Sequence, residues 1–169
     1  MEKLFSPWRS RYIASFANED RSDSCVLCDA SADRNDEEGL IVYRGKEAFV
    51  LMNKFPYNSG HLMVMPVRHT SDFSSLTRSE MAETMELLRA SERALRELLH
   101  PQGFNIGMNL GRVAGAGIDA HLHWHIVPRW NGDTNFMPIL AEVKVVSEEM
   151  VEQGKRLREI FPRMITRDE

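Results

Sequence analysis

Three histidines recur at alternate positions in the middle of the sequence, as His121, His123 and His125. In a β-strand, alternate side chains point to the same face, so a strand here would place all three imidazoles on one side of a sheet. At roughly 3.3 Å of rise per residue, the outer two would lie about 13 Å apart and could not share one metal ion. The three imidazoles must therefore perform different tasks.

The residues around the histidines predict how this strand is placed. Leu122, Trp124 and Ile126 alternate with the imidazoles, so we expect them to pack into the core and turn the histidine face outward toward a site. An alternative is a metal-binding strand of the metallohydrolase or cupin type. Such a site needs carboxylates near the histidines, and the nearest, Asp119, shares their face only if the strand begins early.

The two cysteines of the chain, Cys25 and Cys28, form a Cys-x-x-Cys pair. This spacing occurs in thioredoxin-like redox sites and in half-sites for zinc. A redox site requires a helix after the pair, whereas the polar and acidic residues 29–39 predict a loop. The pattern therefore favours a zinc half-site.

Length and charge limit the kinds of protein that this chain can be. A chain of 169 residues is long enough for one globular domain with a buried core. Its formal net charge of −4 argues against broad binding to nucleic acid or to an anionic membrane. We find no apolar run of membrane-spanning length and no signal-peptide stretch at the N-terminus, so we expect a cytoplasmic protein.

Hydrophobic periodicity predicts an α+β fold with an antiparallel sheet of about five strands. A hairpin is expected over residues 39–43 and 48–52, a loop over 53–60, and further strands over 62–67, 104–110 and the triad. A long helix should start at Thr77 or Ser79 and bury one apolar face, which comprises Met81, Met85, Leu88, Leu95 and Leu99. We expect the strand over 104–110 to be half-buried, and a C-terminal helix, about 147–160, to end before Pro162.

Two segments carry a resemblance to a known family. Residues 60–69, Gly-His-Leu-Met-Val-Met-Pro-Val-Arg-His, and the Gly-Ala-Gly run before His-Leu-His-Trp-His resemble the histidine triad (HIT) family of nucleotidyl transferases and hydrolases. The match extends over residues 25–129. Residues 7–13, the cysteine pair and residues 129–138 further resemble the bacterial diadenosine tetraphosphate phosphorylases (ATP adenylyltransferases) of this family. The resemblance implies a single HIT domain over residues 1–169, with an N-terminal arm (1–24) and a C-terminal helical extension (139–169).

The resemblance also implies which residues perform the chemistry. His123 corresponds to the family's nucleophile, which attacks the α-phosphorus of a nucleotide and forms a covalent nucleotidyl-histidine. Neutral imidazole suits this role if its other nitrogen keeps a proton. His125 would donate to a non-bridging or leaving oxygen, and the turn at Gly115, Ala116 and Gly117 would offer backbone N–H groups to the phosphate.

Substrate contacts are implied in the same way. Asn109 matches a phosphate-contacting asparagine, Asn53 the residue that holds the ribose hydroxyls, and His61 a position near the site. Val26, Leu27 and Leu51 match apolar positions that hold the base. The chain departs from many relatives in the glycine loop, where Gly117 and Ile118 replace a polar pair, so Arg112, Lys54 or Arg129 could supply a phosphate contact instead.

A structural metal and a dimer complete the expectations. In zinc-bearing members of the family the corresponding ligands are Cys25, Cys28, His69 and His121, which would form a closed tetrahedral site. We expect no organic cofactor, a homodimer, and no nucleic-acid or membrane partner. The expected reaction converts diadenosine tetraphosphate and inorganic phosphate to ATP and ADP. The alternatives are a hydrolase of dinucleoside polyphosphates or nucleoside phosphoramidates, and a non-catalytic nucleotide-binding regulator.

Overall fold

The fold was analysed in a computed structural model that describes residues 25–38, 40–133 and 150–165. The predicted N-terminal arm lies outside the described residues, as does most of the chain between the sheet and the last helix. The elements in chain order are α2 (Val26–Ala32), β1 (Ile41–Arg44), β2 (Ala48–Met52), β3 (Leu62–Pro66), the 3-10 helix η1 (Phe73–Ser75), α3 (Arg78–Leu99), β4 (Gly103–Met108), the 3-10 helix η2 (Arg112–Ala114), β5 (Trp124–Arg129) and α5 (Met150–Ile165).

The strands form one five-stranded sheet in the order β1-β2-β3-β5-β4, and every neighbouring pair is antiparallel. The predicted hairpin is β1 and β2, and the predicted loop at 53–60 leads into β3. The expected α+β class, with one long and one C-terminal helix, is confirmed. In the register of the sheet His125 lies beside Met63 on one side and Gly107 on the other.

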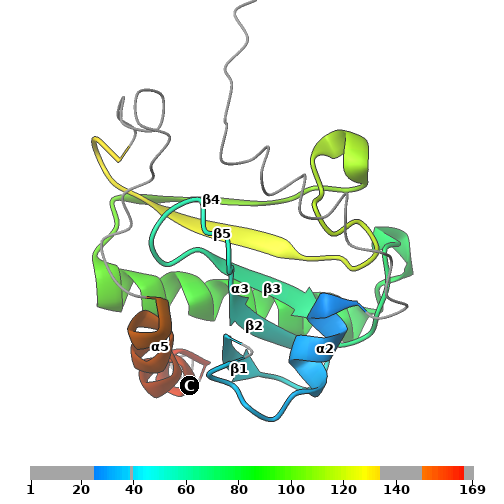
Figure 1. Cartoon of the computed structure of the whole chain (residues 1–169), viewed down its shortest axis with the longest axis horizontal. Coiled ribbons are helices and arrows are strands. Elements are labelled where there is room, and N and C mark those ends of the chain that lie inside the picture. Colours follow the sequence, from blue (N-terminus) through cyan, green and yellow to red (C-terminus); the bar gives the residue numbers. More distant parts are fainter. Residues whose placement is uncertain (1–24, 39, 134–149, 166–169) are drawn as a thin grey trace, which may run out of the picture.

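The two faces of the sheet carry different layers. Helices α3 and α5 pack on one face, where Val50, Leu62 and Ile126 are fully buried, and Figure 1 shows α3 crossing behind the strands. On the opposite face Leu27 of the short helix α2 packs against Leu51 and its neighbours. His125 projects from this second face, because Trp124 and Ile126 on either side of it belong to the α3 core. The sheet thus separates the main core from the side chains that could react.

Helix α3 begins as predicted and buries part of the predicted face, because Leu88 and Leu95 are buried and Leu99 packs against the core. Thr77 caps its first turn by accepting a hydrogen bond from the Glu80 N–H at 3.2 Å. Met81 and Met85, however, are 40% and 53% exposed, so the prediction that they belong to the apolar face was wrong. The helix instead packs through a stripe with many small residues: Thr84, Leu87, Leu88, Ala90, Ser91, Ala94 and Leu95. Small side chains allow close approach to the sheet and α5, and this rotates the buried face away from the methionines.

The predictions for strand burial and for the length of the last helix hold only in part. The strand expected to be half-buried is β4, an edge strand of the sheet; its Phe104 and Met108 are partly buried against the core, whereas Ile106 is 52% exposed. Helix α5 does not end before Pro162 but continues to Ile165. Phe161 and Met164 on either side of the proline are buried in the core. Their packing offsets the main-chain hydrogen bond that a proline cannot donate.

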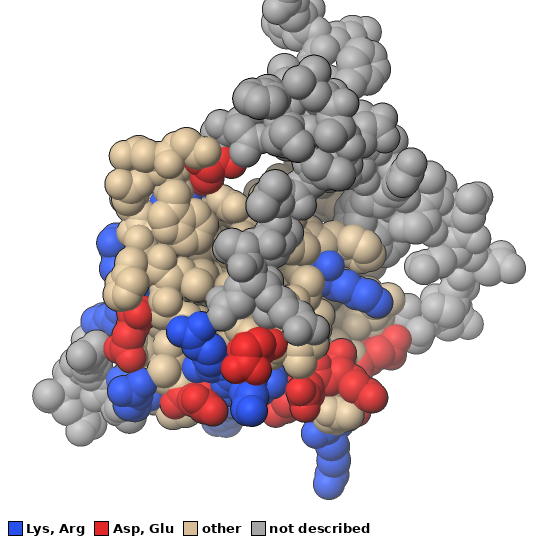
Figure 2. Space-filling view, turned by 60° about the vertical axis from the view of Figure 1, so that its left-hand side comes forward, with Lys and Arg blue, Asp and Glu red and all other residues tan. Residues whose placement is uncertain are grey.

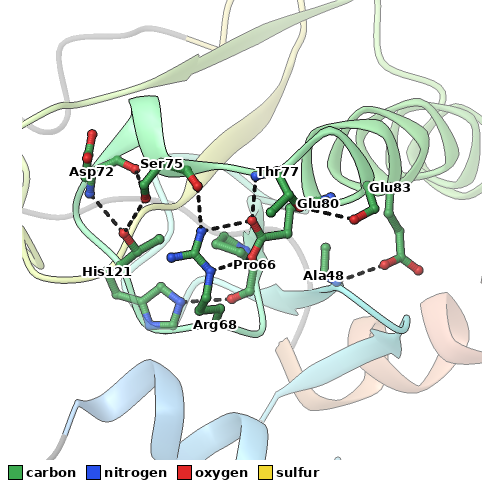
Figure 3. Close-up of polar contacts among 11 residues, drawn as sticks. Ala48, Pro66, Arg68, Asp72, Ser75, Thr77, Glu80, Glu83 and His121 are labelled. Carbon is green, nitrogen blue, oxygen red and sulfur yellow. Dashed lines mark hydrogen bonds and ion pairs between the residues drawn. The ribbon is translucent and has the colours of Figure 1, made fainter.

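A carboxylate of α3 fixes the turn of the β1–β2 hairpin. Glu83 accepts hydrogen bonds from the backbone N–H groups of Lys46 at 2.9 Å, of Glu47, and of Ala48 at 3.0 Å; Figure 3 shows the contact with Ala48. Gly45 begins this turn, and a Cβ atom there would lie 2.5 Å from the Glu83 carboxylate. The hairpin is therefore closed around the Glu83 side chain.

A second carboxylate, Glu80, joins the first turn of α3 to the end of β3. Arg68 donates from Nε to Oε1 of Glu80 at 2.7 Å and from Nη2 to Oε2 at 2.9 Å, as seen in Figure 3. The Thr77 N–H donates to the same carboxylate at 2.8 Å. These contacts, led by the Arg68 hydrogen bond, lower the pKa of Glu80 to about 2. Arg68 is next to His69, so this clamp also fixes the segment that follows β3.

The described surface is mixed in charge. On the face shown in Figure 2, Lys and Arg side chains alternate with Asp and Glu side chains over the lower part, and neither sign forms a continuous patch there. Among the described residues, no helix has the length and apolar character that crossing a membrane requires.

Glu80→Gln should destabilise the protein by about 1–3 kcal/mol at pH 7, because the substitution removes a charge-assisted pair around a buried carboxylate. The pKa of Glu80 in the folded protein, about 2, is lower than the ordinary 4.5. The contribution is therefore complete above pH 4.5 and is lost as the pH falls toward 2. Urea unfolding of both proteins between pH 7 and 2 should show the difference shrinking over that window. The control is Glu86→Gln, at an exposed ion pair of the same helix, which should change stability by less than about 0.5 kcal/mol.

Candidate active site

The histidine triad does not lie wholly in a strand. Strand β5 begins at Trp124, so only His125 belongs to it, and the expectation of three histidines in one strand was wrong. The Leu122 N–H instead donates to the Thr70 carbonyl at 2.8 Å, which draws the chain toward the segment after β3. The alternation itself is confirmed, because Leu122, Trp124 and Ile126 are all in the core.

The histidine rings are also less open than predicted. His121 is 1% exposed and His123 is 5% exposed. Each ring therefore needs hydrogen-bond partners, and those partners decide which nitrogen carries the proton. A partner group that can only donate, or only accept, a hydrogen bond fixes the tautomer of the histidine.

His123 presents a lone pair on Nε2. Its Nδ1 is 2.8 Å from the carbonyl oxygen of His121, and a carbonyl only accepts, so Nδ1 carries the hydrogen. Burial lowers the pKa of His123, although the same hydrogen bond raises it in part. At neutral pH His123 is therefore a neutral imidazole whose Nε2 is unprotonated, which is the form in which imidazole acts as a nucleophile.

His125 has the opposite tautomer because of His61. The Tyr57 N–H donates to His61 Nδ1 at 3.0 Å, so His61 carries its hydrogen on Nε2. That nitrogen is 3.0 Å from Nδ1 of His125, which must accept, and the hydrogen of His125 is then on Nε2. The rings of His123 and His125 are edge to face with centroids 4.9 Å apart. The pair therefore combines one lone pair with one N–H donor.

Sequence analysis placed His61 near the site but did not predict this relay. The contact becomes visible only once β3 is paired with β5, because the register that sets Met63 beside His125 brings His61 to the same face. The glycine before His61 and the strand after it were the available signal. They locate the residue but do not identify its partner.

The glycine loop follows β4 and contains η2. Gly111 and Gly115 have φ angles of 78° and 98°, which residues other than glycine rarely adopt. Asn109 donates from Nδ2 to the Gly115 carbonyl at 3.4 Å, so it holds this turn. Ala116 is buried, and Gly117 is exposed. The structure thus joins Asn109 to the predicted phosphate-binding loop.

The predicted nucleoside residues lie on the same sheet face as His125. Leu51 pairs with Met63, and Met63 pairs with His125, so an apolar row runs from the triad across three strands. Asn53 is 9% exposed and lies 3.3 Å from His61 Nδ1 through its side-chain nitrogen. Leu27 is buried as well, whereas Val26 is 49% exposed.

Two of the three predicted basic contacts are already occupied. Arg112 donates to Asp119 at 2.8 Å. Arg129 donates to both carboxylate oxygens of Asp133, at 2.6 and 2.8 Å. Lys54 is exposed. Asp119 is thus engaged with arginine and lies five residues before β5 begins, which argues against the alternative of a carboxylate-assisted metal strand.

Four side chains, Cys25, Cys28, His69 and His121, form a separate cluster. Their ligand atoms all lie within 4.8 Å of one another. Cys28 Sγ is 3.3 Å from His69 Nδ1 and 3.4 Å from His121 Nδ1. Adjacent ligands around a tetrahedral zinc ion, with bonds of about 2.0–2.3 Å, are about 3.5 Å apart. The cluster therefore has the size and the donor set of a closed tetrahedral site.

His121 connects this cluster to the triad. Its Nε2 is 2.9 Å from the Pro66 carbonyl, shown in Figure 3, so Nε2 carries the hydrogen and Nδ1 faces the cysteines. The backbone carbonyl of His121 accepts the hydrogen bond from Nδ1 of His123. Burial lowers the pKa of His121, which keeps the ring neutral and able to bind a metal.

The predicted loop after the cysteine pair begins only at residue 33, because residues 29–32 belong to a helix. Helix α2 begins directly after Cys25 and contains Cys28. Leu27 anchors this helix in the core, and Arg44 donates to the carbonyls of Ser31 and Asp33 at its end. Burial and the neighbouring Cys25 raise the pKa of Cys28 to about 11. The Cys28 thiol therefore resists ionisation, and a cation bound beside it would reverse that preference.

Comparison with known proteins agrees with this geometry. Residues 34–132 match the model of the HIT domain. The chain belongs to the HIT family. The resemblance inferred from the sequence is thereby confirmed, and the HIT domain spans every element from β1 to β5.

Particular HIT proteins resemble the chain beyond the shared domain. It is 40% identical over 152 residues to the AP-4-A phosphorylase of Mycobacterium tuberculosis, covering 88% of this chain and 78% of that one. A Zn-bound histidine triad family protein from Mycobacterium smegmatis superposes with a TM-score of 0.64 at 29% identity, over 84% of this chain and 96% of that one. Diadenosine triphosphate hydrolase from Plasmodium falciparum shares the fold, with a TM-score of 0.55 at 18% identity, over 75% and 79% of the two chains. The chain is thus a HIT protein whose similarity beyond the shared domain includes a protein named AP-4-A phosphorylase.

Proposed function

We propose that this protein cleaves diadenosine tetraphosphate with inorganic phosphate, giving ATP and ADP, through an adenylyl group carried on His123. The observation that carries the proposal is the complementary pair of tautomers: Nε2 of His123 has a lone pair, and Nε2 of His125 has a hydrogen. The similarity to a protein named AP-4-A phosphorylase supports the choice of substrate and acceptor.

In the first step, His123 Nε2 attacks the α-phosphorus of the substrate. A P–N bond forms, the P–O bond to the departing ATP breaks, and the leaving oxygen takes the electron pair. His125 keeps its proton and donates a hydrogen bond from Nε2 to that oxygen, which stabilises the charge on the leaving group. Backbone N–H groups of the turn at Gly115, Ala116 and Gly117 stabilise the charge that grows on the phosphoryl oxygens.

In the second step, an oxygen of inorganic phosphate attacks the same phosphorus. The P–N bond breaks, ADP leaves, and His123 recovers its lone pair. An unprotonated oxygen of HPO₄²⁻ makes the attack, so no proton has to be removed, and His125 keeps its Nε2 hydrogen through both steps. Asn53 and the apolar residues Val26, Leu27 and Leu51 hold the nucleoside through both steps. Water as the acceptor would give AMP instead of ADP, and this hydrolase is the second candidate because the HIT fold also serves a diadenosine triphosphate hydrolase.

We also propose that Cys25, Cys28, His69 and His121 hold a structural zinc ion. Two thiolates and two imidazoles fill a tetrahedral shell, so the ion would leave no position open for substrate. It would tie α2 and the segment after β3 to His121, whose carbonyl orients His123. Cytoplasmic conditions, which we infer for this protein, would keep both thiols reduced.

The proposed assembly is a homodimer formed through the edge of the sheet. Strand β4 has no neighbour on its outer side among the described strands. Ile106 and Leu110 are 52% and 50% exposed there, and Met85 of α3 is 53% exposed. Ile106 and Met85 border an apolar groove of about 380 Å³ between α3 and β4, on the face opposite the triad. An open edge beside apolar side chains suits pairing with a second copy.

The proposed reaction is tested by resolving the products from diadenosine tetraphosphate with and without phosphate. ATP with phosphate-dependent ADP supports the phosphorylase, whereas ATP with AMP identifies the hydrolase. Absence of products despite measurable binding would mean a regulator and would refute catalysis. His123→Ala should lower kcat by about 10⁴-fold or more, and His100→Ala, at the exposed end of α3, should leave it unchanged. Retained turnover in His123→Ala would exclude the assigned nucleophile.

The zinc site is tested by elemental analysis of protein prepared with zinc under reducing conditions. We expect about one zinc per chain in the unmodified protein and less than about a tenth in Cys28→Ser, with a thermal midpoint lower by about 10 °C. Ser31→Ala in the same helix should retain both values. A zinc-free protein would contradict the proposal.

The dimer is tested by sedimentation velocity. Ile106→Asp should shift the dimer to the mass of a monomer, because it places a charge at the open edge of the sheet. Val151→Asp, at a 41% exposed position of α5, is the control and should remain dimeric. If the unmodified protein is monomeric at micromolar concentration, the interface does not form.

A further inference from the structure

The loop that orients His61 ends at a glycine with a constrained environment. Gly60 has a φ of +74°, and a Cβ atom there would lie 2.5 Å from Leu99 Cδ1 and 2.9 Å from Leu95 Cδ2. The residue is therefore wedged against α3, and it is buried. Its N–H group needs an internal acceptor, because an unpaired buried amide is costly.

Helix α5 supplies that acceptor. Oε1 of Gln153 is 2.9 Å from the Gly60 nitrogen, and Gln153 is only 2% exposed. A backbone N–H only donates, so the oxygen of the Gln153 amide must face the loop. The helix comes close enough because it has a glycine next in sequence: a Cβ atom on Gly154 would lie 3.0 Å from the Met52 sulfur.

From Gly60 the chain turns directly into the histidine relay. The His61 N–H donates to the Asn58 carbonyl at 3.2 Å, which closes the turn, and the Tyr57 N–H donates to His61 Nδ1 at 3.0 Å. The orientation of the Gly60 peptide therefore decides whether the Tyr57 N–H meets the ring. That hydrogen bond, together with the Asn53 side-chain nitrogen 3.3 Å from the same ring nitrogen, sets the tautomers of His61 and His125.

We propose that Gln153 is a positioning residue for the reaction, which makes the C-terminal helix part of the catalytic apparatus. The expected effect on turnover rests on the proposed function. The hydrogen bonds that link Gln153 to the histidines do not depend on it. Gln153 holds the Gly60 peptide, the Gly60 peptide sets the turn, and the turn fixes the hydrogen of His125 on Nε2. The Gln153 hydrogen bond that carries the inference is made to the Gly60 backbone and not to a predicted substrate-binding residue.

The decisive variant is Gln153→Leu, which keeps the approximate size of the side chain and removes the acceptor. We expect kcat for diadenosine tetraphosphate cleavage to fall by between about 10-fold and 100-fold. KM should change by less than about 2-fold, because no substrate contact is lost. Gln153→Glu retains an oxygen acceptor and should recover kcat to within about 5-fold of the unmodified protein.

A control separates positioning from general loss of stability. Met164→Ala removes a buried side chain from the same helix, far along it from the loop. It should lower the thermal midpoint at least as much as Gln153→Leu does and leave kcat unchanged. A matching fall in kcat in both variants would show that Gln153 acts only through stability, and the proposal would be wrong.

Nuclear magnetic resonance tests the geometry without turnover. In the unmodified protein, ¹⁵N shifts should show His61 and His125 protonated on Nε2, and the Gly60 and Tyr57 amide hydrogens should exchange slowly. Gln153→Leu should lose both the slow exchange and the single tautomer, whereas Met164→Ala should keep them. If Gln153→Leu retains the tautomers, or fails to fold while Gln153→Glu folds with altered tautomers, the proposal is refuted. If the unmodified protein does not cleave the substrate, these spectra still decide the positioning role, and only the proposed function fails.

Discussion

The site depends on one hydrogen bond between two residues that are two positions apart in the chain, from Nδ1 of His123 to the carbonyl of His121. A carbonyl has no proton to give, so this contact commits the ring to a single tautomer without any acidic side chain. It also links the chemistry to the main chain, because displacement of the His121 peptide would rotate the imidazole of His123. The surroundings of His121 consequently matter as much as those of His123.

Those surroundings assign a different task to each ring of the histidine cluster. His121 gives one nitrogen to the Pro66 carbonyl and turns the other toward the cysteines. His61 accepts a hydrogen bond from the main chain at Nδ1 and donates one from Nε2 to His125. Backbone groups and imidazoles make most of these contacts, and the Asn53 amide adds one at His61. Burial lowers the pKa of both His121 and His123, so the neutral forms are the ones favoured at neutral pH.

Local pattern in the sequence was enough for much of this arrangement, and long-range packing determined the rest. The alternation around Trp124 correctly assigned which side chains enter the core, and Thr77 correctly marked the start of α3. The exposure of Met85 could not be read from periodicity, because it depends on how closely the small residues of α3 approach the sheet. Proline inside a helical pattern predicts a helix end at Pro162, but burial of the side chains around it overrides that preference. Gln153 carried no sequence signal, since a lone glutamine in an amphipathic helix is ordinary.

The hairpin around Glu83 has a consequence for selectivity. Three consecutive backbone N–H groups in a tight turn resemble the cradles that capture phosphate groups, and in this molecule a resident carboxylate already occupies them. The backbone N–H groups of that turn are therefore not available to bind a polyphosphate chain. The Glu83 carboxylate thus fills one possible anion-binding site of the fold. The hairpin would therefore not compete with the glycine loop for the phosphate groups of the proposed substrate.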